Sequence, residues 1–165
     1  MPIVDTLLPE FDHEMTMTRK VLERVPDDKR DWKPHPKSFS LGALATHVAN
    51  LPTWGSETLN RSDIDVGGTP PLSALPSTSE ILATFDRNVA AARAALTGKT
   101  DAELAAMWSL RRSGKTLFSM PKTAVWRSFV VSHLIHHRAQ LTVYLRLLDV
   151  PVPALYGPSA DEPAF

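Results

Sequence analysis

The sequence predicts an all-α fold, a four-helix bundle, on three observations. Apolar residues recur at steps of three and four along four long segments, which is the period of an α-helix. Helix-capping residues and prolines stand near the ends of these segments. The chain has 165 residues, 43% of them hydrophobic, which is enough for the core of one domain. We therefore expect a single domain over residues 1–165.

The first predicted helix covers residues 2–25, and Pro26 ends it because proline cannot continue the helical hydrogen bonds. The second helix begins near Ser40, a residue type that caps helix N-termini. Pro52 falls inside the second apolar run. We expect a kink or break there, about one turn after His47.

The third predicted helix follows a long connection. Residues 62–76 are rich in Gly, Pro, Ser and Asp and are predicted to form a loop. Ser77 and Glu80 then match the capping-box pattern at the start of a helix, which Gly98 ends. With so long a loop before it, this helix need not be antiparallel to the second.

Two shorter elements are predicted before the last helix. Thr100 and Glu103 repeat the capping-box pattern and indicate a short helix. In residues 108–120, apolar residues flank a turn signal at Ser113 and Gly114, which favours a short β-hairpin.

The last predicted helix covers residues 122–149, with Pro121 at its first turn. Two histidines lie on its apolar face, which is the most regular in the chain. That face consists of Trp126, Val130, His133, His137, Leu141, Tyr144 and Leu148.

Composition excludes several classes of function. Lys plus Arg and Asp plus Glu both number 18, so the chain lacks the basic excess typical of nucleic-acid-binding proteins. It has no cysteine, which excludes disulfides, thiolate zinc sites and cysteine nucleophiles. No apolar run approaches the roughly 20 residues of a membrane helix, and the N-terminus does not resemble a signal peptide. We expect a cytoplasmic protein with no nucleic-acid or membrane partner.

The histidines carry the clearest chemical signal. His133 and His137 are four residues apart, so on a helix they lie on one face, about 6 Å apart along the axis. Two such rings can bind one metal ion at nitrogen–metal distances of about 2.1 Å. A further ligand must come from another helix, and His47 is the only other histidine on an apolar face. The sequence thus predicts a metal site at His47, His133 and His137.

Other interpretations stay open from the residues alone. A histidine pair at this spacing is more often two ordinary core or surface residues that hydrogen-bond to their neighbours. His136 competes as a ligand, but we expect it in a helix or subunit contact or hydrogen-bonded to a ligand histidine. His13 and His35 are expected on the surface or in loops. Because Glu is missing between His133 and His137, the base of the zinc proteases is absent from its usual place.

Several segments together resemble a known family. Residues 133–146 read HLIHHRAQLTVYLR, and residues 150–162 read VPVPALYGPSADE. Residues 38–48, SFSLGALATHV, carry a single histidine. These segments strongly resemble the DinB (DNA-damage-inducible) family, also called the DinB/YfiT-like metalloenzymes. Ala139 is the visible departure, since the family often has glycine there.

The resemblance implies an up-down-down-up four-helix bundle that is commonly a homodimer. It also implies one divalent metal ion, nickel or zinc, held by three histidines. Those positions correspond to His47, His133 and His137, the same three that the apolar faces select. The family name does not imply DNA binding.

Three protein ligands leave an open position on the metal, as in catalytic sites. The resemblance favours transfer of a low-molecular-weight thiol to a small electrophile, in detoxification or a stress response, because related bundles are thiol S-transferases. A hydrolase that uses metal-bound water is the first alternative. A non-catalytic stress protein that binds a metal or ligand is the second.

Overall fold

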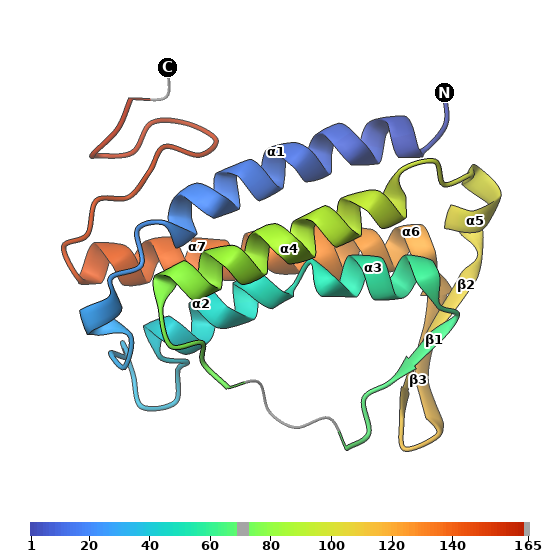
Figure 1. Cartoon of the computed structure of the whole chain (residues 1–165), viewed down its shortest axis with the longest axis horizontal. Helices are drawn as coiled ribbons and strands as arrows, with labels where there is room; N and C mark the ends of the chain where they lie inside the picture. The colour runs from blue at the N-terminus through green and yellow to red at the C-terminus, as the bar shows by residue number, and fades with distance from the viewer. Residues whose placement is uncertain (69–72, 164–165) are drawn as a thin grey trace.

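Long helices make up most of the computed structural model, which describes residues 1–68 and 73–163, and a small sheet lies at one end (Figure 1). The helices are α1 (Val4–Leu22), α2 (Leu41–Asn50), α3 (Thr53–Asn60), α4 (Thr78–Leu96), α5 (Asp101–Ala105), α6 (Lys122–Val125) and α7 (His133–Leu147). A 3₁₀ turn covers Asp27–Lys29, and a π-helical segment, Trp126–Ser132, joins α6 to α7. The strands are β1 (Asp63–Asp65), β2 (Met107–Arg112) and β3 (Lys115–Pro121).

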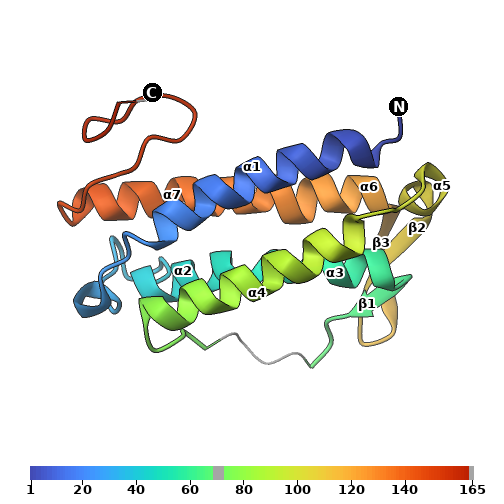
Figure 2. The ribbon, with the colours of Figure 1, turned by 45° about the horizontal axis from the view of Figure 1, so that its top comes forward.

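The long helices enclose one hydrophobic core. Both α1 and α2 pack against α4 and α7, while α3 packs against α4 and the π-helical segment. α1 and α7 run away from the sheet, and α2, α3 and α4 run back toward it (Figures 1 and 2). Buried apolar side chains come from each of these elements, for example Phe11, Leu44, Phe85, Trp126 and Leu141.

The sequence predicted several helix ends correctly. The Ser40 hydroxyl accepts the Ala43 N–H at 3.2 Å and caps α2. Ser77 caps α4 in the same way, and Thr100 and Glu103 form a reciprocal capping box at α5. Such a side chain stabilises a helix by about 1 kcal/mol because it satisfies a free N–H group.

The predicted break at Pro52 is confirmed. α2 ends at Asn50 and α3 begins at Thr53, since proline offers no N–H to the helical ladder. Leu51 and Pro52 keep right-handed helical dihedral angles, so α3 continues in nearly the direction of α2. His47 on α2 and Trp54 on α3 therefore belong to one interrupted helical run.

The prediction of an all-α fold is wrong in one respect, because the chain also has a three-stranded sheet. β1 lies inside the predicted loop 62–76, of which residues 69–72 are outside the described part, and it pairs in parallel with β2. β2 and β3 are antiparallel around Ser113 and Gly114. The Asp65 carboxylate accepts N–H groups of Ser113 and Gly114 at 2.8 and 2.7 Å, so β1 also holds the turn. The hydrogen bond from Gly114 is the main cause that lowers the pKa of Asp65, and the one from Ser113 adds to it.

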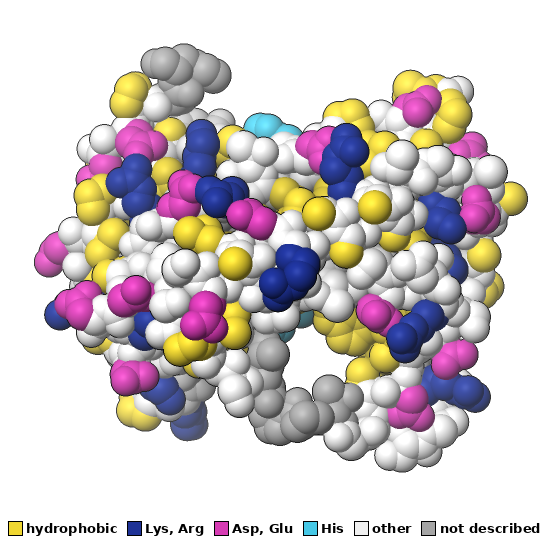
Figure 3. All heavy atoms as spheres, in the orientation of Figure 1, with side chains coloured by type: hydrophobic (Ala, Val, Ile, Leu, Met, Phe, Trp, Pro, Cys, Tyr) yellow, Lys and Arg dark blue, Asp and Glu magenta, His cyan; other side chains and the backbone are white. Residues whose placement is uncertain are grey.

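Charged side chains of both signs are interspersed on the face shown in Figure 3. Two ion pairs join α1 to α4: Arg19 binds Asp86 and Arg93 binds Asp12, with closest distances of 2.9 and 2.8 Å. Among the helices of the described residues, none has both the length and the apolar character needed to span a membrane.

A buried polar cluster ties the C-terminal segment to the bundle. Arg138 on α7 is only 1% exposed and pairs with the buried Glu14 of α1 at 2.7 Å. Arg138 also donates to the Thr18 hydroxyl at 3.2 Å. The Tyr156 hydroxyl donates to Glu14 at 2.7 Å, so a residue beyond α7 completes the cluster.

Candidate metal centre

Three histidines from two helices meet at one point. His47 lies on α2, and His133 and His137 lie one turn apart on α7. His133 Nε2 is 2.9 Å from His137 Nε2 and 3.5 Å from His47 Nε2. All three ligand atoms lie within 4.8 Å of one another. The structure thus brings together every residue that the sequence predicted as a metal ligand.

These distances suit one shared ion. Two nitrogens bound at about 2.1 Å are about 3.0 Å apart at a right angle and about 3.4 Å apart in a tetrahedron. The separations of His133 Nε2 from the other two nitrogens, 2.9 and 3.5 Å, match that range. Imidazole nitrogen is a good ligand for nickel and zinc. The residues present therefore fit a divalent transition-metal ion.

Burial favours the neutral form of the three imidazole rings, which is the form that binds a metal ion. It is the main cause that lowers the pKa of His47 to about 4, with the nearby His137 and His133 adding to the effect. Burial also lowers the pKa of His133 and of His137. A neutral imidazole has a free lone pair, so near neutral pH a metal ion need not displace protons from these rings.

Gln140 orients one of the ligand rings. Its Oε1 lies 2.7 Å from His137 Nδ1, which places the ring proton on Nδ1 and leaves Nε2 free for metal. The Gln140 amide nitrogen lies 3.2 Å from His136 Nε2. His136 thus contacts the centre through Gln140. This role of Gln140 was not predicted, although its spacing of three from His137 on a helix was a usable signal.

The surroundings of the centre are open on one side. The Phe39 ring stacks on His47, with ring centres 6.0 Å apart. Beside His133 lies a depression of about 420 Å³, which we call the histidine hollow. It is lined by Ser128, Phe129, Ser132, His133 and His136. No carboxylate joins the three histidines in the described part of the chain.

The remaining histidines stay apart from this cluster. His13 is exposed on α1, and its ring centre lies 6.4 Å from that of Tyr156. His35 is exposed in the loop before α2, where its Nδ1 accepts the Lys37 N–H at 3.2 Å. Both lie on the surface, as the sequence predicted.

Comparison with known proteins agrees with the resemblance seen in the sequence. The model of the DinB family matches residues 1–164. The chain belongs to the DinB family. The chain is also similar to "Uncharacterized protein YrdA" from Bacillus subtilis strain 168, which is 26% identical over 161 residues and aligns with 96% of this chain and 91% of its own length.

Two solved DinB-like structures share the fold. One, from Bacillus cereus ATCC 10987, is 25% identical and has a TM-score of 0.71, covering 90% of this chain and 95% of its own. The other, from Bacillus subtilis, is 16% identical with a TM-score of 0.67, covering 88% and 95%. At 16% identity the second comparison supports the DinB fold alone.

Proposed function

We propose that this DinB-family chain is a divalent-metal-dependent enzyme that transfers a low-molecular-weight thiol to a small electrophile in detoxification or a stress response. One observation carries the proposal: three histidines meet at metal-binding distances beside an open hollow. Such a centre leaves room for an exogenous ligand, as catalytic metal sites do. Nickel or zinc, when bound, would lower the pKa of a thiol and so raise its thiolate fraction at neutral pH.

The residues around the centre have separate roles in binding the metal ion and the thiol. His47, His133 and His137 hold the ion, and Gln140 keeps the His137 ring in the metal-binding tautomer. Ser132 and His136 offer polar groups in the histidine hollow to the rest of the thiol. In the transfer, the sulfur–carbon bond forms while the leaving group departs with its electron pair, and the thiol proton goes to solvent.

A metal-dependent hydrolase is the second candidate, and His136 favours it. This ring lies in the hollow beside His133, where it could take a proton from an attacking water. The lack of a carboxylate beside the three histidines in the described residues favours thiol transfer. A binding protein without turnover is the third candidate.

The test incubates nickel- or zinc-loaded protein with cysteine, glutathione and other small thiols, together with the chromogenic electrophile chlorodinitrobenzene. We expect metal-dependent release of the coloured thioether, its loss in His133→Ala, and no change in the matched variant His35→Ala. Rates no better than those of His133→Ala with every thiol would reject thiol transfer. Hydrolysis of p-nitrophenyl esters without thiol would support the hydrolase. A large fall in thermal midpoint with chelator and no turnover would support a binding role.

The arrangement of the helices and the oligomeric state belong to the same proposal. We infer an up-down-down-up four-helix bundle, with α2 and α3 counted as one helix interrupted at Pro52, and a cytoplasmic homodimer. The flank carrying Phe129, His136 and Val143 is one candidate dimer surface, and Val143 is 57% exposed. Light scattering after size-exclusion chromatography tests the dimer, and Val143→Glu should yield monomers if this flank forms the interface.

A further inference from the structure

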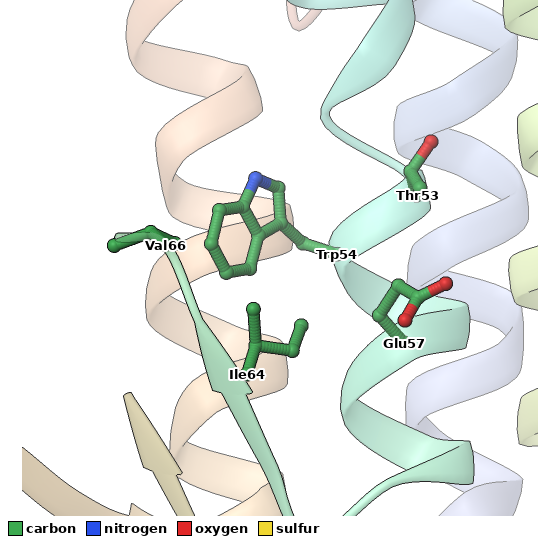
Figure 4. A pocket seen from close by; sticks show the side chains of 5 residues that line it. All are labelled: Thr53, Trp54, Glu57, Ile64 and Val66. Atoms are coloured by element: carbon green, nitrogen blue, oxygen red, sulfur yellow. The ribbon is translucent and has the colours of Figure 1, made fainter. Parts of the chain in front are cut away.

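A second depression lies near the sheet, between α3 and β1. It has a volume of about 250 Å³ and is lined by Thr53, Trp54, Glu57, Ile64 and Val66, and we call it the Trp54 pocket. Figure 4 shows the Trp54 indole extending from α3 toward Val66, with the Ile64 side chain directed at the same ring. The Trp54, Ile64 and Val66 side chains thus form an apolar surface.

Aromatic rings connect this pocket to the histidine hollow. The ring centres of Trp54 and Phe129 are 6.4 Å apart, and Phe129 lines the hollow beside His133. Phe118 of β3 stacks on Phe129 with centres 5.2 Å apart. Both Trp54 and Phe129 are only half-buried, so their rings offer contact area to a ligand.

The chain places both rings on the same side of the metal centre. Trp54 follows His47 by seven residues on a helical run that leads toward the sheet. Phe129 precedes His133 by four residues on a run that leads away from it. At 1.5 Å per residue, the Trp54 backbone lies roughly 10 Å from that of His47. A ligand of two rings, or of one ring with a short chain, can span this distance.

The size and charge of the pocket select the ligand. An apolar cavity of about 150 Å³ can hold benzene, so the larger Trp54 pocket has room for a substituted ring. Its single charged lining residue, Glu57, pairs with Arg61 at 2.8 Å. Because the carboxylate is neutralised locally, the pocket offers little net attraction to an ion. Apolar walls with one paired charge favour an uncharged aromatic compound.

We propose that the Trp54 pocket binds the uncharged aromatic ring of a small electrophile, whose reactive end extends along Trp54 and Phe129 to the metal centre. The aromatic class of the electrophile rests on the proposed thiol transfer, whereas the binding of the ring does not. The pocket lies outside the three histidines and is reached from them through the Trp54–Phe129 pair.

The test measures binding of 2-naphthol, which is uncharged at neutral pH, to metal-free protein by isothermal titration calorimetry. We expect saturable binding by the wild type and at least tenfold weaker binding by Val66→Asp, which places a charge in the pocket. Leu147→Asp adds the same charge at a site that is 58% exposed on α7, at the opposite end of the molecule, and should bind like the wild type. Circular dichroism checks folding. If Val66→Asp does not fold, Trp54→Leu replaces it with the same expected loss.

Two outcomes would overturn the proposal: no saturable binding, or equal affinity in the wild type and the folded pocket variant. Binding is measured without metal or thiol, so it can succeed where transfer activity fails. With an active enzyme, Val66→Asp should raise the KM for naphthylmethyl chloride about tenfold and leave the KM for iodoacetamide unchanged. Active transfer with both KM values unchanged would reject the pocket while keeping the thiol transferase.

Discussion

The Nδ1 atom of His137 lies 2.7 Å from Oε1 of Gln140, so the side of the ring opposite its metal-binding nitrogen is held by an amide. Removing such a partner typically lowers metal affinity by about 10- to 100-fold, because the ring loses its orientation and tautomer. We expect Gln140→Leu to show a loss of this size and Gln140→Glu, which keeps an acceptor, to lose less. Competition with a chromophoric chelator measures the affinity. Equal affinity in Gln140→Leu and wild type would contradict this role.

Metal content provides the most direct check on the ligand set. The untagged wild type should hold about one divalent ion per chain by plasma mass spectrometry, whereas His47→Ala and His137→Ala should hold almost none. Three nitrogen ligands in one cluster are expected to act together, so losing one removes most of the affinity. The surface variant His35→Ala is the matched control. An ion retained in both core variants would place the site elsewhere.

Acid should destabilise the metal-free protein through His47. Its pKa is 6.5 in the unfolded chain and about 4 in the folded state, so the unfolded chain binds more protons between these values. Above about pH 6.5 protonation of His47 therefore costs the folded state nothing, and the free energy of unfolding decreases as the pH falls toward about 4. Urea unfolding across this window should show a steeper fall in the wild type than in His47→Gln. Parallel curves would count against a depressed pKa.

The Arg138–Glu14 pair should matter for stability. Arg138→Met leaves a buried carboxylate without its cation, and such losses cost about 3–5 kcal/mol. At about 2–4 °C per kcal/mol, the thermal midpoint should fall by roughly 6–20 °C. The double variant Arg138→Met/Glu14→Gln should recover part of the loss.

An exposed ion pair supplies the control for that measurement. Arg146 pairs with Asp161 at 2.5 Å, but its side chain is 47% exposed. Surface pairs contribute about 0–1 kcal/mol, so Arg146→Met should shift the midpoint only slightly. Equal shifts in Arg138→Met and Arg146→Met would mean that burial adds nothing to the Arg138–Glu14 pair.

Much of the helical framework could be predicted because helices follow local rules. The spacing of apolar residues, the helix caps and the break at Pro52 depend on residues that are close together in the sequence. The same is true of the pairing of His133 with His137 on one face. β1 was missed because a three-residue strand is too short for a pattern, and its partner lies more than 40 residues later. The role of His47 needed the second helix to be placed in space, for which the sequence offered only its apolar face and a family resemblance.

The π-helical segment before His133 has a consequence for how this site is specified. Each residue in an α-helix turns the chain by about 100°, and a π turn holds one residue more than an α turn. If Trp126–Ser132 kept all its residues but were wound as regular α-helix, the chain after it would be rotated by about 100°. His133 and His137 would then point away from His47, although every ligand would still be present. The winding of the helix before the ligands, and not only the identity of the residues, thus determines whether the three imidazoles can converge.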